Sequence, residues 1–433
     1  MGGNKEFENL PEGWKWVRLG EVIENTYPGE WGDNPIDNEN IFPVFSTLAI
    51  DYDGRIDFTK AVPRKLNKKK IEKLKLKKGM ILIEKSGGST DTPAGKVAIL
   101  KQDFEGTCSN FIQILKPNNN TCNSYYLFYR LLYNFKNNLI EKYQQRTTGI
   151  INFILKDYFN EYIPLPPLPE QQKIAEILET IDNSIEKTDK IIEKYKRIKQ
   201  GLMQDLLTKG IDENGNIRNE KTHKFKDSPL GRIPEEWEVV RLGEIFNIKA
   251  GGDIDKLSYC DIKDKRFQYP IFSNTLENKG LYGYSDKFTY PENCITITGR
   301  WTLGHAIPRF EKFNAIIRVL VLIPKFEMNI VFVSEYINNK INFIIESTGV
   351  PQLTAPKVAE YYIPLPPLPE QQRIAEILSQ TDQTIEKEQQ YKEKLQKIKQ
   401  GLMQDLLTGK VRVNHLVEEK ENEQRYTSNF TRT

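Results

Sequence analysis

Basic side chains gather in one short segment of this chain. Residues 60–78 contain ten Lys or Arg and a single acid, Glu72. Such a density of cations provides the salt-dependent attraction for phosphates on which nucleic-acid binding rests. A solvated helix face would have the same composition, and the sequence does not decide between these two interpretations. The candidate phosphate contacts are Arg64, Lys65, Lys68, Lys69 and Lys70, with Lys85 further along the chain.

Further candidates for contact with DNA lie near expected turns. The second half of the chain offers two small basic clusters, KDKRF at 263–267 and TGRW at 298–301. Side chains with several donors or acceptors can read base edges, and one good bidentate pair contributes about 1–3 kcal/mol of discrimination. The candidates are Lys263, Lys265, Arg266, Arg300 and Gln352 in the second half and Arg146 in the first.

No catalytic motif withstands inspection. The stretch GGSTDTPAGKV at 87–97 resembles a phosphate loop, but its spacing differs and Val97 stands where Ser or Thr is required. A turn between strands is the better interpretation. NPID at 34–37 lacks the second Pro and the aromatic residue with which amino-methylating enzymes hold a flipped base. Four Cys and three His are scattered without metal-ligand spacing. We therefore expect a non-catalytic protein, with a cryptic site of Asp, Glu and Lys as the open alternative.

Length and composition set the frame for these candidates. A chain of 433 residues is too long for one ordinary core, so two or three domains are expected. The net charge is only +3, so any basic footprint must be local. The four Cys are scattered without a recognisable disulfide pattern, which fits a reduced cytoplasm. The N-terminal segment lacks an apolar core, and no apolar run reaches the ~18 residues of a membrane span. The expectation is a soluble cytoplasmic protein.

The elements that position these residues occur twice. YIPLPPLPEQQKIAEIL at 162–178 returns at 362–378 with a single change, Lys173 to Arg373. KQGLMQDLLT at 199–208 returns unchanged at 399–408. PEGWKWVRLGE and PEEWEVVRLGE open the two halves, and TTGI and STGV precede the two hinges. The chain is therefore a tandem duplication in which each half comprises a variable body, a proline-rich hinge and a long helix.

Each body is expected to mix strands and helices. In both, a VFS or IFS strand follows the Trp-containing opening, and short β-rich runs such as MILIEKS and CITITG come next. A helical stretch then precedes the TTG or STG turn. The prolines of the hinge hold the chain extended, and Pro169 suits the first helical position. A proline-rich ligand for an SH3-like domain is the weaker interpretation, because both copies continue directly into a helix.

A heptad seam runs along each predicted helix. Steps of four and three separate Ile174, Leu178, Ile181, Ile185, Thr188, Ile192 and Tyr195 in the first helix. The second helix continues its stripe through Leu395, Ile398 and Leu402 after an interruption at Glu388 and Lys392. Helices of about 39 residues would be roughly 58 Å long. We expect them to pair with each other, antiparallel, because a parallel pair would force the short linker to span the whole helix.

The predicted fold class is α+β. Two mixed α/β bodies are joined by two long helices that form an antiparallel coiled coil, and the internal duplication makes the whole pseudo-twofold. The linker is expected to be exposed and the charged tail frayed. The expected parts are a first body at 1–161, its hinge and helix at 162–208, a linker at 209–233, a second body at 234–361, its hinge and helix at 362–408, and a tail at 409–433.

The repeated residues also carry a resemblance. IPLPPLPEQQKIAEIL before a heptad helix, present twice, and FKDSPLGRIPEEWEVVRLGE at 225–244 resemble the specificity subunit of type I restriction–modification systems, over nearly the whole chain. The resemblance implies that each body is a target recognition domain for one half of a bipartite double-stranded DNA sequence. It implies that the helices space the half-sites and dock two methyltransferase subunits, to which restriction subunits add. S-adenosylmethionine, ATP and Mg²⁺ would belong to those partners, with no cofactor in this subunit.

Two nearly identical helix starts suit two copies of one partner. The candidate partner-binding residues are Glu170, Gln171, Gln172 and Glu176 with Glu370, Gln371, Gln372 and Glu376. Two other classes of protein stay open. One is a scaffold that brings two identical partners together without DNA, and the other is a self-sufficient nuclease or methyltransferase with a cryptic site.

Overall fold

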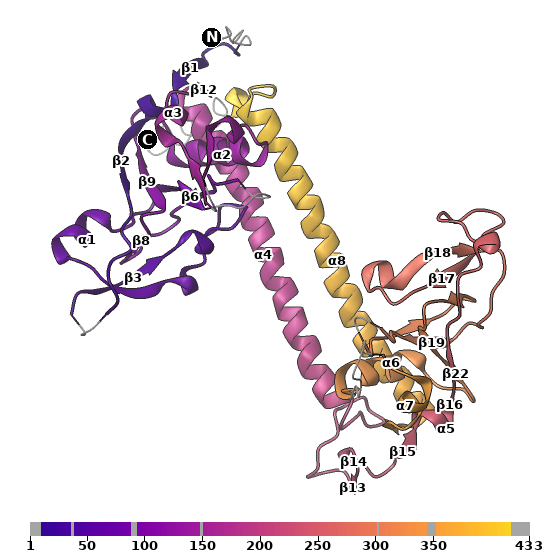
Figure 1. Ribbon diagram of the computed structural model, residues 1–433. Helices are drawn as coiled ribbons and strands as arrows, with labels where there is room; N and C mark the ends of the chain where they lie inside the picture. The colour runs from indigo at the N-terminus through magenta and orange to yellow at the C-terminus, as the bar shows by residue number, and fades with distance from the viewer. Residues whose placement is uncertain are drawn as a thin grey trace, which may run out of the picture. The chain divides into compact units, whose positions relative to one another are not determined.

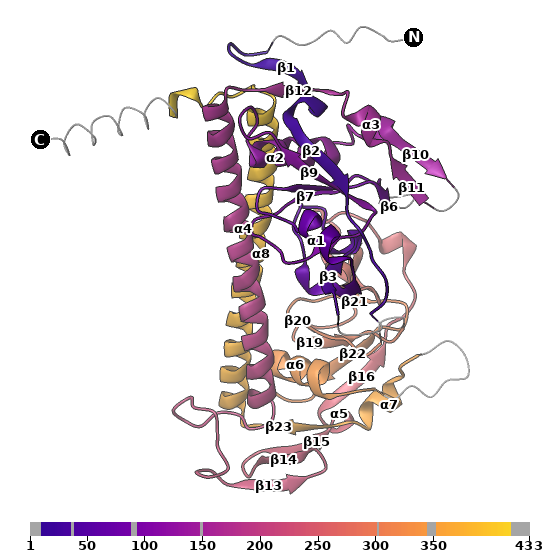
Figure 2. The same cartoon turned by 90° about the vertical axis from the view of Figure 1, so that its left-hand side faces the viewer.

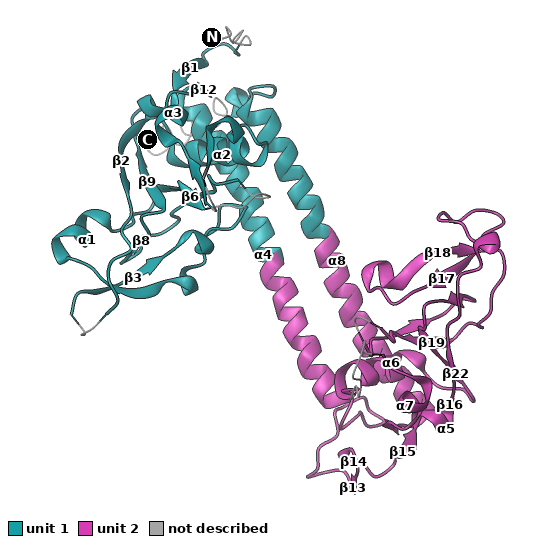
Figure 3. Ribbon diagram, viewed as in Figure 1, with its two compact units in different colours: residues 1–188, 391–433 teal, residues 189–390 magenta. Residues whose placement is uncertain are grey.

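The chain forms two compact units. The computed structural model describes residues 10–35, 39–87, 93–147, 150–300, 303–343 and 352–416. Unit 1 comprises residues 1–188 and 391–433, and unit 2 comprises residues 189–390 (Figure 3). The two long helices are α4 (Leu168–Leu206) and α8 (Leu368–Leu407) (Figure 1), and the division falls within both (Figure 3). Each unit therefore contains a body and one part of each long helix.

The body of unit 1 is a mixture of short strands and helices. Its helices are α1 (Lys68–Leu74), α2 (Ser124–Lys136) and α3 (Leu155–Tyr158). Its strands are β1 (Lys15–Arg18), β2 (Ile23–Pro28), β3 (Ile41–Phe45), β4 (Val62–Lys65), β5 (Ile81–Glu84), β6 (Ser86–Gly87), β7 (Val97–Ile99), β8 (Thr107–Cys108), β9 (Ile112–Pro117), β10 (Gln144–Thr147), β11 (Ile150–Phe153) and β12 (Tyr162–Leu165).

The body of unit 2 has the same kinds of element. Its helices are α5 (Leu242–Ile245), α6 (Ile330–Lys340) and α7 (Ala355–Ala359). Its strands are β13 (Phe225–Ser228), β14 (Gly231–Pro234), β15 (Glu238–Arg241), β16 (Phe246–Ala250), β17 (Tyr269–Phe272), β18 (Leu281–Ser285), β19 (Cys294–Ile297), β20 (Ala306–Arg309), β21 (Asn314–Ala315), β22 (Leu320–Pro324) and β23 (Tyr362–Leu365).

The two bodies share their sheet topology although their sequences differ. A four-stranded antiparallel sheet has the order β2-β9-β5-β7 in unit 1 and β16-β22-β19-β20 in unit 2. A three-stranded sheet has the order β4-β3-β8 in one and β18-β17-β21 in the other, and in both the last pair is parallel. The predicted mixed α/β bodies and their VFS and IFS strands are confirmed.

One segment distinguishes the described parts of the two bodies. Between β4 and β5, unit 1 inserts α1, whereas the residues between β18 and β19 form no helix in unit 2. Most of the basic run lies in that insertion. Unit 1 also has a hairpin, β10 and β11, that pairs with β6 (Figure 2). The stretch of unit 2 at 344–351 lies outside the described residues, as do residues 88–92 of the glycine-rich stretch and residues 36–37 of NPID.

Each proline hinge is partly a strand. In unit 1, β12 pairs antiparallel with β1, so that Lys15 faces Leu165 and Arg18 faces Tyr162. In unit 2, β23 pairs with β15 in the same register, Glu238 to Leu365. The repeated opening segment and the repeated hinge are therefore two strands of one ribbon. The helices begin at Leu168 and Leu368. Pro169 therefore occupies the second helical position instead of the predicted first, and its missing N–H leaves no bond unmade there.

Within each unit the long helices pack antiparallel. The start of α4 and the end of α8 share one core in unit 1, which includes Ile174, Leu178, Met403 and Leu406. The end of α4 and the start of α8 do the same in unit 2. The predicted seam is buried at Ile185, Thr188, Ile192 and Leu395, but Ile398 is 41% exposed, so the prediction for that residue was wrong. Lys399 is buried in its place.

Lysine enters the seam because a carboxylate faces it. In unit 1, Lys399 Nζ lies 2.6 Å from Asp182 Oδ1, and the Tyr129 hydroxyl donates to the other oxygen of Asp182 at 2.8 Å. In unit 2, Lys199 Nζ bonds both oxygens of Asp382 at 2.7 Å. Each pair joins α4 to α8 at one height along the helices, so the pairs fix the antiparallel register.

The linker and the start of the tail are anchored to the units. Ile211, Arg218 and Ile233 are buried in unit 2, and β13 and β14 form a hairpin. Most of the remaining linker residues are exposed, as expected, but these three contacts were not anticipated. Val413 is buried in unit 1, while residues 417–433 lie outside the described residues. Among the described helices, none combines the length and apolar character that a membrane crossing requires.

Candidate functional site

A buried carboxylate at the start of α4 gathers three parts of unit 1. The Trp14 indole N–H donates to Glu170 Oε2 at 3.0 Å. Arg412, just past the end of α8, grips the same carboxylate with two bonds of 2.7 and 2.9 Å. Glu170 is 3% exposed. A bidentate guanidinium and an indole donor together satisfy this carboxylate, so it ties the opening segment and the tail to the hinge.

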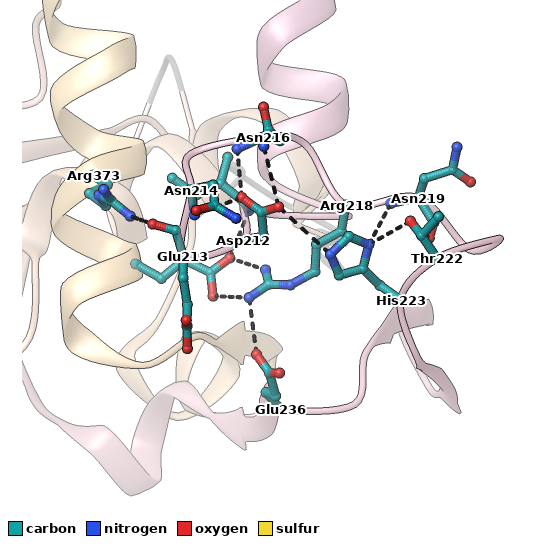
Figure 4. A network of polar contacts seen from close by, with 12 residues as sticks. Asp212, Glu213, Asn214, Asn216, Arg218, Asn219, Thr222, His223, Glu236 and Arg373 are labelled. Carbon is teal, nitrogen blue, oxygen red and sulfur yellow. Dashed lines mark hydrogen bonds and ion pairs between the residues drawn. The ribbon is translucent and has the colours of Figure 1, made fainter.

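Unit 2 repeats the arrangement with a residue of the linker. The Trp237 indole donates to Glu370 Oε2 at 3.1 Å, and Arg218 binds Glu370 through both of its terminal nitrogens. Arg218 also donates to Glu236 at 3.0 Å (Figure 4). Gly210 has φ +62°, and a Cβ there would lie 2.5 Å from the Trp237 ring. Only glycine fits this turn, which brings Arg218 back to the helix start.

The next residue of each hinge binds the body. Gln171 accepts the backbone N–H of Asn123 at 2.8 Å and donates to the Pro166 carbonyl at 2.8 Å. Asn123 in turn caps α2. Gln371 makes the matching bonds to Asn329, the cap of α6, at 2.9 Å and to Pro366 at 2.8 Å. The Glu-Gln pair thus fixes the angle at which the body leaves the helix.

These contacts separate the predicted partner-binding residues into two groups. Glu170, Gln171, Glu370 and Gln371 are buried, and their polar atoms are used inside their own unit. They are not available to a partner on the surface. Gln172, Glu176, Gln372 and Glu376 are exposed, and for these four the partner role stays a prediction.

The single change between the hinges also has a local reason. Lys173 pairs with Glu176 on its own helix at 3.3 Å. Arg373 instead reaches the linker and donates to the Glu213 carbonyl at 2.8 Å (Figure 4). That linker loop is held by Asp212, which accepts the backbone N–H groups of Asn214 and Asn216 at 2.9 and 2.8 Å. Those bonds, the Asn216 N–H foremost, lower the pKa of Asp212.

The basic run of unit 1 is partly neutralised by its surroundings. Lys70 pairs with Glu30 at 3.0 Å, Lys75 with Glu105 at 2.7 Å and Lys77 with Asp103 at 3.1 Å. The guanidinium of Arg64 is engaged by the Trp31 and Gly32 carbonyls and the Asn34 side chain, over the Trp31 ring. Lys65 is half-buried, and Lys68 and Lys69 are exposed on the first turn of α1. Contact of this run with DNA stays a prediction.

A lysine-lined groove of about 900 Å³ lies beside the same helix. Its floor includes Tyr27, Leu74 and Met80. The lysines along it are Lys70, Lys73, Lys77, Lys78 and Lys116. Lys116 also pairs with Glu24 at 3.0 Å, so part of the positive charge along the groove is balanced.

The basic cluster of unit 2 lies on the surface. Lys263, Lys265 and Arg266 are exposed. Arg266 bonds Asp286 at 3.0 and 3.2 Å, and Lys263 lies 6.0 Å from the centre of the Tyr284 ring. A partly paired arginine on an exposed loop can still meet a phosphate, since such pairs contribute little.

Two residues predicted as base readers lie together in unit 2. Arg300 follows β19, and its Nη2 donates to Gln352 Oε1 at 3.2 Å although the residues are 52 apart in sequence. Their backbones form a bridge. The buried Asn274 side chain accepts the N–H of Gly299 at 2.7 Å and of Arg300 at 3.3 Å, which holds this backbone in place. Trp301, the other end of the TGRW cluster, lies outside the described residues.

A strained turn packs against the backbone next to Arg300. Ile317 and Arg318 have φ of +52° and +63°, in the left-handed region that β-branched residues avoid. Asn274 donates to the Ile317 carbonyl, and the Arg318 carbonyl packs against Gly299. Such residues cost on the order of 1–3 kcal/mol each and persist where their surroundings hold them, often at functional sites.

The matching place in unit 1 carries different side chains. Ser86 follows β5, the counterpart of β19, and pairs through its backbone with Asn152. The Ser86 hydroxyl donates to Asn152 Oδ1 at 2.6 Å. Lys85 is half-buried beside it, and Arg146 is exposed on β10. We call Lys85, Ser86 and Asn152 in unit 1, and Arg300, Arg318 and Gln352 in unit 2, the variable edge. It is the same in architecture and different in chemistry.

Groups that could react are few among the described residues. No cluster of three or more His, Cys, Asp or Glu able to hold a metal occurs in the described part of the chain. Burial raises the pKa of the Cys108 and Cys122 thiols to about 12 and of Cys294 to about 11, so they are neutral core side chains. Burial, partly offset by Lys96, also raises the pKa of Glu84 next to the variable edge.

Several of these residues were missed by sequence reasoning. Trp14 and Trp237 lie in the repeated opening segment, and that repetition was a usable signal. Arg218 and Arg412 stand ten and four residues after the repeated KQGLMQDLLT, so no common spacing marks them. Asn274 had no signal, because its role depends on strands that are distant in sequence.

Comparison with known proteins agrees with this duplicated architecture. The family model described as type I restriction modification DNA specificity domain matches residues 11–197 and again 234–397. The MjaVIII specificity subunit of a type I restriction enzyme from Methanocaldococcus jannaschii is 30% identical over 439 residues, covering 95% of this chain and 96% of that one. The putative MjaX specificity subunit of the same organism is 33% identical over 427 residues, covering 94% and 96%.

Solved structures show the same fold. The type I restriction–modification S subunit from M. genitalium matches with a TM-score of 0.62 at 18% identity, covering 93% of this chain and 98% of that one. A chain from a study of assembly and conformational transition of a type I system matches with a TM-score of 0.53 at 20% identity, covering 93% and 100%. The chain belongs to the specificity subunits of type I restriction–modification systems, which recognise DNA and are not themselves catalytic.

Proposed function

We propose that each body reads one half of a bipartite DNA target and that the two long helices set the gap between the halves. The observation that carries this proposal is the variable edge. One topology, held by one hinge network, presents Ser86 and Asn152 in unit 1 but Arg300 and Gln352 in unit 2. Two readers of different base sequences need this combination of a shared frame and different tips.

The two ends of the helices form the proposed docking surface for two methyltransferase subunits. In unit 1 the proposed contact residues are the exposed Gln172 and Glu176 of α4 and the exposed Gln400, Gly401 and Gln404 of α8. In unit 2 the exposed residues at the matching positions are Gln372, Glu376, Gln200, Gly201 and Gln204. The five residues are identical in type although the middle parts of the helices differ. One partner in two copies would require this identity, whereas exposure to water alone would not.

The glycines strengthen this assignment. Gly201 and Gly401 lie inside long helices, and no neighbouring atom lies within 4 Å of where a Cβ would stand. A glycine in a helix interior costs about 0.5–1 kcal/mol relative to alanine. No described contact inside either unit requires that cost. Close approach of a partner's backbone to the helix surface would require it twice.

Insertion of one heptad into each long helix tests the proposed spacing. Seven residues placed after Thr188 and after Gln390 fall at the division between the units and leave each unit's contacts whole. Each helix lengthens by about 10 Å, which corresponds to about three base-pair steps of DNA. We expect the methylated half-sites in host DNA to keep their bases while the gap grows. An unchanged gap would contradict the role of the helices as a spacer.

Exchange of one body tests whether the two bodies read DNA independently. Replacement of residues 11–160 by the first body of a relative should change one half-site and leave the other unchanged. A change in both half-sites would count against independent readers. If the purified chain with its methyltransferase does not retard duplex DNA in a salt-dependent way, a scaffold without DNA contact becomes the better description.

A further inference from the structure

We propose that Arg300 reads a guanine in the half-site of unit 2 and that Gln352 positions it. This inference rests on the proposed function and adds the base and the residue. An arginine fork binds the O6 and N7 atoms of guanine with two parallel hydrogen bonds. Arg300 is half-buried, and its backbone is fixed by Asn274. It therefore projects from a rigid support rather than from a loose loop.

The hydrogen bond between Arg300 and Gln352 indicates which of the two residues contacts the base. Glutamine reads adenine by using its carbonyl oxygen and its amide together. In unit 2 the carbonyl oxygen Oε1 of Gln352 already accepts a bond from Arg300 Nη2. That bond uses one hydrogen of Nη2 and leaves Nη1 and the second hydrogen of Nη2 for a base. Gln352 is thus the positioning residue, and Arg300 supplies the fork.

The strained turn gives the reason for this rigidity. Ile317 and Arg318 keep left-handed backbone angles next to Gly299, and Asn274 bonds both this turn and the Arg300 backbone. One buried amide therefore holds the two segments from which the arginines of the edge leave. Unit 1 has Asn110 and Phe111 between β8 and β9, where unit 2 has the strained turn, and neither has a positive φ. The strained turn that supports Arg300 in unit 2 therefore has no equivalent at Asn110 and Phe111 of unit 1.

Selection from a randomised duplex library tests the assignment. The full-length chain with its methyltransferase subunits is incubated with the library, and the bound sequences are read for wild type, Arg300→Ala, Arg300→Lys and Gln352→Ala. We expect Arg300→Ala to lose a preference for guanine at one position of one half-site by about 5- to 150-fold, the equivalent of about 1–3 kcal/mol. Gln352→Ala should keep the same base with a weaker preference, and Arg300→Lys should lose part of it because lysine lacks the fork.

Arg232→Ala is the matched control, because Arg232 is an exposed arginine of unit 2 on β14, away from the edge. It should select the wild-type sequences. Unchanged preferences in Arg300→Ala, equal preferences in Arg300→Lys and wild type, or a change in both half-sites would each overturn the inference. Those results would leave the proposed function standing, whereas a wild-type chain that selects no split sequence would contradict the proposed function itself. Thermal unfolding of each variant identifies loss of fold, and Arg300→Lys then carries the test.

Discussion

The two units are alike at their hinges and differ in chemistry at their variable edges. At the hinge, Trp, Glu, Gln and the capping Asn make the same bonds in both units, at 3.0 and 3.1 Å for the indole and at 2.8 and 2.9 Å for the asparagine. At the variable edge, the same strands carry Ser86 and Asn152 in one unit and Arg300 and Gln352 in the other. The comparison shows that the hydrogen bonds of the hinge are the same in both units, while the side chains of the variable edge differ.

The ion pairs divide unequally between the units. The hinge pair is buried more deeply in unit 2, where Arg218 and Glu370 are each 8% exposed, than in unit 1, where Arg412 is 27% exposed. The helix pair shows the reverse. Lys399 and Asp182 are 7% and 13% exposed in unit 1, while Asp382 in unit 2 is 47% exposed. Matched substitutions should therefore have unequal effects.

Removal of the hinge carboxylate should have the largest effect. Glu370→Ala leaves the buried Arg218 guanidinium with only the exposed Glu236 as a partner, which costs about 3–5 kcal/mol. Glu170→Ala should cost less, about 1–3 kcal/mol, because Arg412 can reach water. Hydrogen exchange of peptides from each unit measures the two losses separately. Equal losses would show that burial of the arginine does not control the effect, and Glu370→Ala combined with Arg218→Met should recover part of the stability.

Removal of the helix lysine should have the next largest effect, with the order of the units reversed. Lys399→Ala leaves Asp182 buried with only the Tyr129 hydroxyl, for about 1–3 kcal/mol. Lys199→Ala removes this lysine from Asp382, which is 47% exposed, and from Glu335 at 3.8 Å. Because Asp382 already reaches water, the loss should be about 0–1 kcal/mol. Denaturant unfolding of the two variants gives the comparison. A larger loss for Lys199→Ala would contradict the exposure argument.

The helix glycines should respond in opposite ways in the free chain and in the complex. Gly201→Ala and Gly401→Ala should each stabilise the free chain by about 0.5–1 kcal/mol, because alanine favours the helix and meets no neighbour. The same substitutions should weaken assembly with methyltransferase subunits. Thermal unfolding and a pull-down measure the two effects. The control is Lys187→Ala at an exposed position of α4 outside the repeated ends, which should leave assembly unchanged. Full assembly of both glycine variants would refute the docking surface.

Acid should have the smallest effect, and in unit 2 it should act partly through a histidine. Burial, and second the Arg309 guanidinium, lower the pKa of His305. A base with a lowered folded pKa adds stability that is present above its ordinary range and is lost as the pH falls through the folded pKa. His305→Gln should therefore flatten the fall in unit 2 stability on acidification. Hydrogen exchange of unit 2 peptides, measured from neutral to mildly acid pH, would show the smaller loss of stability. If the dependence of stability on pH is the same in His305→Gln and wild type, His305 is not its source.

The architecture could be predicted from the sequence because its main elements lie in segments that occur twice. The hinge, the long helices, their antiparallel pairing and the mixed bodies all followed from segments present twice. Burial at the hinge did not follow, because a Glu-Gln pair in a helix start is polar by composition, and only the positions of Trp14, Arg412 and Asn123 make it internal. The helix stripe failed at Ile398 for the same reason, since a facing aspartate let Lys399 take the buried place.

The candidate site could be predicted only in part. Arg300 and Gln352 were both named from turn positions, but their contact depends on a bridge between segments far apart in sequence. The basic run looked stronger than it is, because the acids that pair with it, such as Glu30 and Asp103, come from other strands and loops. Local composition therefore identified charged residues without showing which charges remain available.

The two hinges differ in when their partner residues are synthesised. Unit 2 is continuous in sequence, and its arginine, Arg218, is made before the Glu370 that it binds. Unit 1 is discontinuous, and its carboxylate, Glu170, waits for Arg412, which lies 242 residues later. During synthesis from the N-terminus, the second unit can close as soon as its helix start emerges. The hinge of unit 1, whose carboxylate is synthesised first, is therefore completed last.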